Sequence, residues 1–315
     1  MTYPKGGSMN QTTVHQAQPV RGAETLFGPI QELMQDDAVE EIWINRPDEI
    51  WFHSKSRSTR INVKLSSQDI ERMLERMLRG TARRLDRSRP FIDATLADGS
   101  RLHAVVPDIT RENISVNIRK FSKSTPTLEG LLLSGFLTEP QFDQLIGIVH
   151  TAGSILVSGA TQAGKTTLLT AILNSFGPTE RVISVEDTFE LKLRCPDWVA
   201  MQTRPAHSSA VDDVDLRRLL RESLRMRPTR LAVGEVRGAE ALELLVALNS
   251  GIPAYCTIHA NSASEAIDKL VSLPLMATST ISAKFVTKVF ERSVSLVVHC
   301  RTENGVRRVV ELVEP

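Results

Sequence analysis

Residues 159–166 of this chain read Gly159-Ala160-Thr161-Gln162-Ala163-Gly164-Lys165-Thr166. This stretch fits the pattern G-x-x-x-x-G-K-[ST], in which the backbone N–H groups of a glycine-rich loop surround phosphate oxygens. An apolar stretch at 155–157 precedes it, and an amphipathic stretch at 168–173 follows it. A strand, a glycine-rich loop and a helix in this order predict a P-loop nucleotide site, whereas the motif alone is also compatible with a chance glycine loop.

The chemistry of such a loop assigns a role to each part. Lys165 would reach the β- and γ-phosphates of ATP, and the hydroxyl of Thr166 would bind Mg²⁺. The helix that begins after the loop favours an anion at its N-terminus. The predicted ATP-binding residues are Gly159, Ala160, Thr161, Gln162, Ala163, Gly164, Lys165, Thr166 and Thr167.

Two acidic residues end apolar stretches downstream of the loop. Residues 231–235 close on Glu235, and residues 181–187 repeat the pattern with Glu186. Ligands of open α/β sheets bind at the carboxyl ends of the strands, so both carboxylates would face the nucleotide. Transfer of a phosphoryl group to water needs a metal ion and a group that orients the water. Either acid alone is explained as well by a solvated strand end, but together with Thr166 they are the predicted Mg²⁺ ligands.

Strands and helices alternate over residues 128–315, which predicts an α/β domain with a mostly parallel sheet. A turn at Asn304-Gly305 predicts a closing hairpin. The expected strands are 154–158, 181–185, 230–233, 254–258, 294–298 and 306–313, and the expected helices are 165–176, 212–226 and 239–249.

Residues 23–121 have a different pattern, which predicts a small α+β domain. Ser66 begins a capping box, so a helix is expected after it, and Asp98-Gly99 is typical of a hairpin turn. Residues 1–22 read as a flexible tail, and residues 122–127 as a linker. The expected strands are 39–45, 49–53, 91–96, 102–106 and 114–118.

Composition narrows the function classes. The 315 residues carry a net charge of +1, which gives no electrostatic footprint for general nucleic-acid binding. The three cysteines form no CxxC pair, so the sequence indicates neither a disulfide framework nor a zinc ribbon. The expected setting is the reducing cytoplasm. No apolar run reaches the roughly 18–20 residues of a membrane helix. Any membrane connection is therefore expected to run through a partner.

Six blocks of the chain resemble the type II/type IV secretion ATPases, and most closely the CpaF/TadA group of tight-adherence pilus motors. The resemblance extends over nearly the whole chain after the tail. Three stretches look like named blocks of that family. Residues 180–191 resemble its Asp box, residues 224–228 with 233–238 its Walker B block, and residues 256–262 its His box. Further similar blocks are residues 98–101, 118–121 and 202–205, the last of which points to CpaF.

The resemblance implies roles for particular residues. Glu186 and Glu235 would share the positioning of metal and water, and His259 would lie near the γ-phosphate. Arg119 and Arg225 would contact phosphate charge, within one subunit or across a subunit boundary, for which a planar and always charged guanidinium is suited. Without the resemblance, a lone His after a strand is more simply a structural residue, and either Arg a surface residue. With Lys165, these residues make up the predicted catalytic set.

The resemblance also implies an architecture and a setting. An N-terminal α+β domain would join a RecA-like ATPase domain, with ATP and Mg²⁺ bound between the two. Six copies would form a homo-hexamer in the cytoplasm, at the inner face of the cell membrane. ATP hydrolysis would then move one domain against the other and pass force to an inner-membrane platform protein of a pilus or secretion system.

One departure from the family concerns the loop itself. Family members usually have Gly and Ser or Thr where this chain has Gln162 and Ala163. Neither position supplies the lysine or the Mg²⁺ hydroxyl, so ATP binding is expected to survive. Turnover is expected to be sensitive, because Gln adopts positive φ less readily than Gly.

Three alternatives to a pilus or secretion motor stay open. A conjugative ATPase of the TrbB group is the nearest and has a similar compact length. A nucleotide-binding switch that does not hydrolyse is suggested by Gln162 and Ala163. A RecA-like DNA translocase is disfavoured by the near-neutral charge and by the absence of a basic-aromatic strip.

Overall fold

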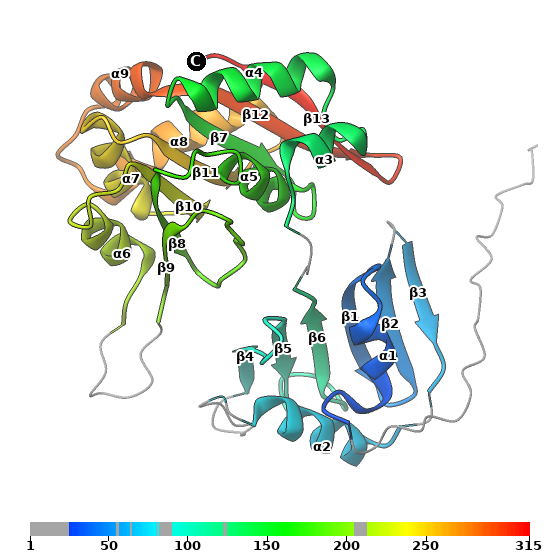
Figure 1. Cartoon of the computed structure of the whole chain (residues 1–315). Coiled ribbons are helices and arrows are strands. Elements are labelled where there is room, and N and C mark those ends of the chain that lie inside the picture. Colours follow the sequence, from blue (N-terminus) through cyan, green and yellow to red (C-terminus); the bar gives the residue numbers. More distant parts are fainter. Residues whose placement is uncertain are drawn as a thin grey trace, which may run out of the picture. The chain divides into compact units, whose positions relative to one another are not determined.

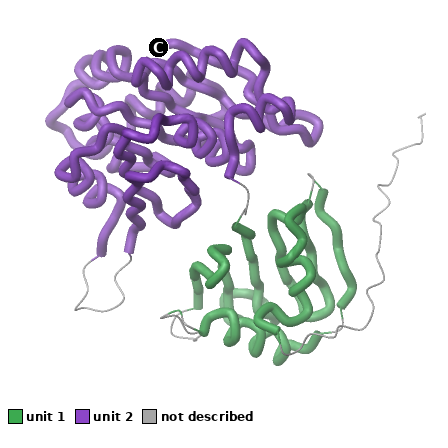
Figure 2. Tube along the Cα trace, viewed as in Figure 1, with its two compact units in different colours: residues 1–123 green, residues 124–315 purple. Residues whose placement is uncertain are grey.

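The structure, a computed structural model, describes residues 25–54, 57–63, 65–79, 81, 90–121, 125–204 and 213–315 (Figure 1). The chain divides into two compact units, residues 1–123 and 124–315 (Figure 2). The predicted tail, residues 1–22, lies outside the described residues, and so do residues 122–124 of the predicted linker.

Unit 1 is built on a six-stranded antiparallel sheet with the order β3-β2-β1-β6-β5-β4. Each expected strand is present, and the expected turn at Asp98-Gly99 joins β4 to β5, with Gly99 at a φ of 87°. The strand β3 was not predicted. The strands are β1 (Val39–Arg46), β2 (Glu49–Ser54), β3 (Arg57–Ile61), β4 (Phe91–Thr95), β5 (Arg101–Val105) and β6 (Ser115–Arg119).

The helix α2 (Ser67–Leu78) packs on this sheet. Its predicted capping box is present: the Ser66 hydroxyl accepts from the Asp69 backbone N–H, and the Asp69 carboxylate accepts from the Ser66 N–H. Its apolar side and the inward side chains of the strands form one core. A short 3₁₀ turn, η1 (Gly28–Ile30), and the helix α1 (Gln31–Gln35) complete this core.

Unit 2 is built on a seven-stranded sheet with the order β13-β12-β7-β11-β10-β8-β9. Every pair is parallel except β12 with β13, which form the predicted antiparallel hairpin. The mostly parallel α/β fold class is therefore confirmed. The strands are β7 (Ser154–Gly159), β8 (Arg181–Glu186), β9 (Asp197–Gln202), β10 (Arg230–Val236), β11 (Ala254–His259), β12 (Val294–Glu303) and β13 (Val306–Val313).

Helices cover both faces of this sheet, so its central strands are buried on both sides (Figure 1). This burial explains why β7, β8 and β11 read as continuous apolar stretches without alternation. One face carries α3 (Leu128–Leu133), α4 (Glu139–His150) and α5 (Lys165–Leu173). The other carries α6 (Leu216–Ser223), α7 (Glu240–Asn249), α8 (Ala263–Ala277) and α9 (Ala283–Ser293).

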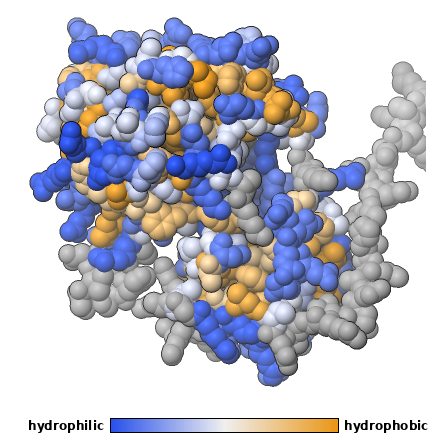
Figure 3. Space-filling model, in the orientation of Figure 1, coloured by the Kyte–Doolittle hydropathy of each residue, from blue (hydrophilic) through white to orange (hydrophobic). Residues whose placement is uncertain are grey.

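The surface of unit 2 is mixed in polarity. On the face drawn in Figure 3, its hydrophobic residues are interspersed with hydrophilic ones. The most exposed large hydrophobic side chains are Leu133 and Met276, on separate helices. None of the helices in the described part of the chain is both long and apolar enough to cross a membrane.

Candidate functional site

The P-loop connects the carboxyl end of β7 to the first turn of α5. Two glycines shape it. At Gly159, with a φ of 151°, a Cβ atom would lie 2.4 Å from the backbone oxygen of Cys300. At Gly164, with a φ of 95°, a Cβ atom would lie 2.7 Å from the ring of Phe136. A side chain at either position would clash with these atoms and would adopt a φ that L residues rarely take. The backbone that the two glycines permit turns N–H groups inward, as phosphate binding requires.

Gln162 has a φ of 63°, in the left-handed region that Gln adopts less readily than Gly. A non-glycine residue there costs on the order of 1 kcal/mol. Ala163, the next residue, is buried in the core that also contains the apolar side chains of α5. Ala160, Thr161, Gln162 and Thr167 are exposed, and Thr166 is half-buried in the first turn of α5.

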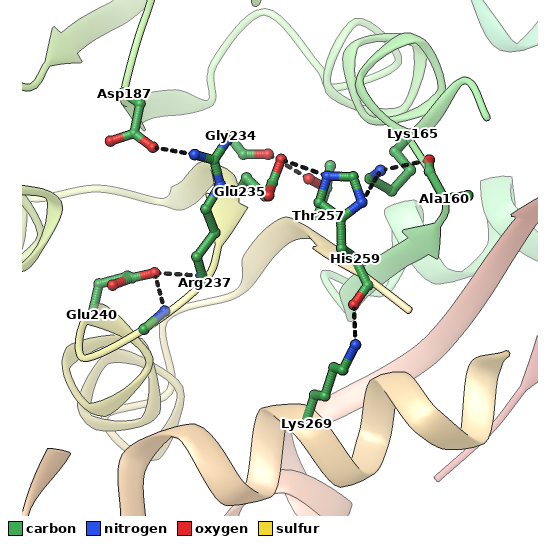
Figure 4. A network of polar contacts seen from close by, with 11 residues as sticks. Ala160, Lys165, Asp187, Gly234, Glu235, Arg237, Glu240, Thr257, His259 and Lys269 are labelled. Carbon is green, nitrogen blue, oxygen red and sulfur yellow. Dashed lines mark hydrogen bonds and ion pairs between the residues drawn. The ribbon is translucent and has the colours of Figure 1, made fainter. Parts of the chain in front are cut away.

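Three of the predicted catalytic residues form one chain of contacts across three strands' ends (Figure 4). The Lys165 Nζ donates to the Ala160 oxygen at 2.9 Å and lies 3.3 Å from His259 Nδ1. His259 Nε2 in turn lies 3.3 Å from Glu235 Oε2. Because the ends of β7, β10 and β11 meet at one edge of the sheet, residues far apart in sequence converge there.

The contacts of His259 fix where its proton lies. A lysine ammonium has only donors, so Nδ1 accepts from Lys165, and the proton of a neutral ring is on Nε2, facing Glu235. Burial and then the charge of Lys165 lower the pKa of His259 below its ordinary 6.5. The ring is therefore mainly neutral at pH 7 and donates to Glu235.

Glu235 lies among groups that favour its ionised form. Burial opposes its ionisation, but a hydrogen bond and the charge from Arg237, aided by His259 and Lys165, hold its pKa below 4.5. Its side chain is 18% exposed, so it is ionised yet largely shielded from water. Such a group can orient a water molecule and accept its proton.

Glu186, the second predicted carboxylate, is more deeply buried than Glu235. It is buried, and its Oε2 accepts from the backbone N–H groups of Glu190 and Leu191 at 2.7 and 2.9 Å. Its Oε1 is buried without a hydrogen-bond partner among the described residues. Its side chain packs on the backbone just before Glu235, since a Cβ at Gly234 would lie 3.2 Å from the Glu186 Cγ. Both acids thus lie at the same edge of the sheet, and Glu186 is the more deeply buried of the two.

The environment of Glu186 should make stability depend on pH. Burial raises the pKa of Glu186 from 4.5 to about 7. Between these two pH values the folded chain holds a proton that the unfolded chain releases, so this residue's contribution to stability falls as pH rises. Glu186→Gln carries no such proton. Its free energy of unfolding relative to wild type should therefore rise by about 2 kcal/mol between pH 5 and pH 8.

Urea unfolding in EDTA at both pH values measures this difference. Glu291→Gln, which removes a carboxylate at an exposed position of α9, serves as the matched control. A pH-independent difference for Glu186→Gln would mean that Glu186 is ionised in the folded chain throughout this range.

The predicted catalytic set also includes two arginines. Arg225 follows α6 and is exposed, and its backbone N–H donates to Glu222. Arg119 is the last residue of β6, in unit 1, and is exposed. The roles predicted for both guanidinium groups stay predictions.

The fold and this site can be set beside known proteins. Residues 23–313 match the family model described as "Type II/IV secretion system protein". This chain belongs to that family. A putative conjugal transfer protein of Mycobacterium tuberculosis is 32% identical, over 90% of this chain and 83% of that protein. The predicted resemblance to type II/type IV secretion ATPases is confirmed, while the closer relation to the CpaF/TadA group stays a prediction.

Solved structures of two ATPases share the fold. The VirB11 ATPase of the Brucella suis type IV secretion system is 26% identical, with a TM-score of 0.50 over 91% of this chain and 92% of that one. The Legionella pneumophila ATPase DotB is 21% identical, with a TM-score of 0.72 over 96% of this chain and 84% of that one. The second likeness concerns the fold alone.

Sequence reasoning missed several side chains of the site in this family member. Arg237 contacts both Glu235 and Asp187, and Glu240 accepts from the backbone just after β10. Thr257 donates to the Gly234 oxygen at 2.6 Å, which fixes the peptide before Glu235. Lys269 donates to the His259 oxygen at 3.0 Å. The signals for Arg237 were its position two residues after Glu235 and its place in the block 233–238 that resembles the family's Walker B block.

The residues present fit ATP and Mg²⁺, the groups that the motif implies. The loop's left-handed glycines permit a phosphate cradle, and the buried Glu186 Oε1 is an oxygen still in need of a partner. The described residues hold no group of three or more His, Cys, Asp or Glu side chains arranged for a metal. Mg²⁺ does not need one, because it binds through one or two carboxylates together with substrate phosphates. Thr166, Glu186 and Glu235 stay the predicted Mg²⁺ ligands.

Proposed function

We propose that this chain hydrolyses ATP and works as a ring-shaped motor of a secretion, conjugation or pilus machine. The observation that carries the proposal is the chain of contacts from Lys165 through His259 to Glu235, at the edge of the sheet where the P-loop begins. A P-loop alone would support binding. An ionised, shielded Glu235 beside it supports hydrolysis over a non-hydrolysing switch.

Each residue has a distinct task in this proposal. The backbone N–H groups of residues 160–165 bind the phosphates, and Lys165 turns from Ala160 and His259 to the β- and γ-phosphates. Bound Mg²⁺ supplies the charge that neutralises the phosphate oxygens. Glu235 orients the attacking water and takes its proton, while the Nε2 proton of His259 keeps the carboxylate in place. Glu186 supports the loop at 187–191 and offers Oε1 to the metal's coordination.

The setting of the motor follows from the family and the relatives. The Mycobacterium tuberculosis relative is a putative conjugal transfer protein, and VirB11 belongs to a type IV secretion system. These names support conjugation or type IV secretion as the setting, in addition to a pilus machine. We infer a homo-hexamer in the cytoplasm that acts on a platform protein at the inner face of the cell membrane, without direct binding of nucleic acid.

Assembly should control the rate of hydrolysis. If an arginine from one subunit reaches the ATP held by another, turnover per subunit should rise as dilute protein is concentrated and the ring forms. Arginines supplied to transferring phosphate in other P-loop enzymes are worth about 10³–10⁵ in rate. Arg119→Ala should then lower turnover by about tenfold or more while ATP affinity changes little.

The experiment measures phosphate release per subunit across a dilution series, with mass from light scattering. Arg60→Ala is the matched control, because Arg60 also lies on the unit 1 sheet and pairs with Glu49. Constant turnover in a sample that stays monomeric would contradict the ring while leaving the ATPase proposal intact. An Arg119→Ala ring with wild-type turnover would exclude Arg119 as the donated arginine.

A further inference from the structure

Arg237 follows the last residue of β10 and lies between two carboxylates that come from different strands (Figure 4). Its Nε donates to Glu235 Oε1 at 2.5 Å. Its Nη1 lies 3.4 Å from Asp187 Oδ2, in the loop after β8. The guanidinium is planar and its donors have a fixed geometry, so two carboxylates on different sides restrict its orientation.

The backbone of Arg237 is fixed as well. Glu240 Oε1 accepts from the Arg237 N–H at 2.5 Å and from the Gly238 N–H at 2.8 Å. Glu240 lies at the start of α7 and is only 8% exposed, so this anchor is itself held by packing. The backbone of Arg237 is therefore held by Glu240, and its guanidinium is held by Glu235 and Asp187.

The fixed position of Arg237 restricts the orientation of the Glu235 carboxylate. Its two oxygens have different partners: Oε1 accepts from Arg237, and Oε2 faces His259 Nε2 at 3.3 Å. A carboxylate is planar, so a fixed Oε1 determines where Oε2 points. Thr257 fixes the peptide before Glu235 through the Gly234 oxygen, so the carboxylate is held at its tip and at its base.

We propose that Arg237 is a positioning residue that holds the Glu235 carboxylate in the orientation in which it faces His259. This inference rests on the proposed function, because it concerns the residue to which water orientation is assigned. An exposed ion pair usually contributes little to a protein. This pair differs, because the Glu235 side chain is only 18% exposed and its other oxygen has a neighbour in the site.

The expected signature is a loss of rate without a loss of binding. Arg237→Gln should lower kcat by between about tenfold and 10²-fold, the effect of misplacing a catalytic group. ATP affinity, measured by fluorescence titration in EDTA and in Mg²⁺, should change by less than about threefold, since Arg237 does not belong to the P-loop. Arg237→Lys keeps the charge and should restore part of kcat. Arg308→Gln, which removes an exposed pair with Glu303, is the matched control and should keep wild-type kcat.

A double-mutant cycle with Glu235→Gln separates positioning from general damage. If Arg237 acts through Glu235, Arg237→Gln should cost little further rate in a chain that already carries Glu235→Gln. Urea unfolding of the four proteins without nucleotide gives a second readout, in which the loss of midpoint in the double variant should be smaller than the sum of the two single losses.

Two failures can be told apart. Wild-type turnover in Glu235→Gln would overturn the assignment of Glu235 itself, and with it the role of Arg237. If Glu235→Gln loses turnover but Arg237→Gln costs the same factor in both backgrounds, the hydrolysis proposal stands and the positioning role is refuted. Loss of ATP affinity in Arg237→Gln equal to its loss of kcat/KM, with kcat unchanged, would likewise refute it.

Discussion

A Lys165→Ala variant should lose ATPase activity altogether while it keeps its fold. Lys165 is 7% exposed, and its ammonium reaches the Ala160 oxygen and His259. In the site it is the P-loop cation that the phosphates meet, so its loss should weaken ATP binding and remove charge stabilisation in the transition state. We expect kcat to fall by at least about 10³-fold, to the level of the blank.

The measurement is phosphate release from purified protein, with circular dichroism to verify the fold. Lys284→Ala, at an exposed position of α9, is the matched control and should hydrolyse ATP at the wild-type rate. Unchanged turnover in a folded Lys165→Ala sample would remove the P-loop assignment, whatever the family membership of the chain.

A Glu235→Gln variant should bind ATP and hydrolyse it slowly. The substitution keeps the shape of the side chain and its contact with Arg237 but removes the negative charge. A neutral amide cannot take a proton from water, so kcat should fall by roughly 10²-fold or more, the range for losing a general base. ATP affinity should remain within a few-fold of wild type, because the phosphate contacts of the P-loop remain.

Isothermal titration and phosphate release on the same sample separate these two effects. Glu291→Gln serves again as the exposed control. A Glu235→Gln chain that hydrolyses ATP at nearly the wild-type rate would make Glu235 structural, and the catalytic role would then pass to Glu186, whose Oε1 has no hydrogen-bond partner among the described residues.

The centre of unit 2 could be predicted because local signals there agree. A strand, a glycine loop and a helix follow one another at residues 154–173, and apolar stretches end on Glu186 and Glu235. The helices α3, α4, α8 and α9 and the strand β9 were not predicted. In β9 the side chains are half-buried at the sheet edge, which weakens the apolar signal. The expected helix at 212–226 is described only as Leu216–Ser223.

The site was predicted less completely than the fold, for a physical reason. The strand-end position predicted that Glu235 reaches the site edge, the P-loop motif predicted this for Lys165, and the family resemblance implied it for His259. The structure brings the three side chains into contact. Which side chains then pair depends on loop courses. The Glu186 carboxylate accepts from two N–H groups of the loop that follows it, and Arg237 meets Asp187 from another strand. Sequence spacing contains no information about either contact.

Steady-state phosphate release by the wild-type chain is the most direct test of ATP hydrolysis at this site. The chain should be assayed at a concentration where light scattering finds the assembled ring, with ATP and Mg²⁺ and in parallel with EDTA. We predict release over many turnovers that depends on Mg²⁺ and disappears in Lys165→Ala. ATP binding without phosphate release above the blank, in an assembled and Mg²⁺-loaded sample, would contradict the proposal that this chain is a motor ATPase.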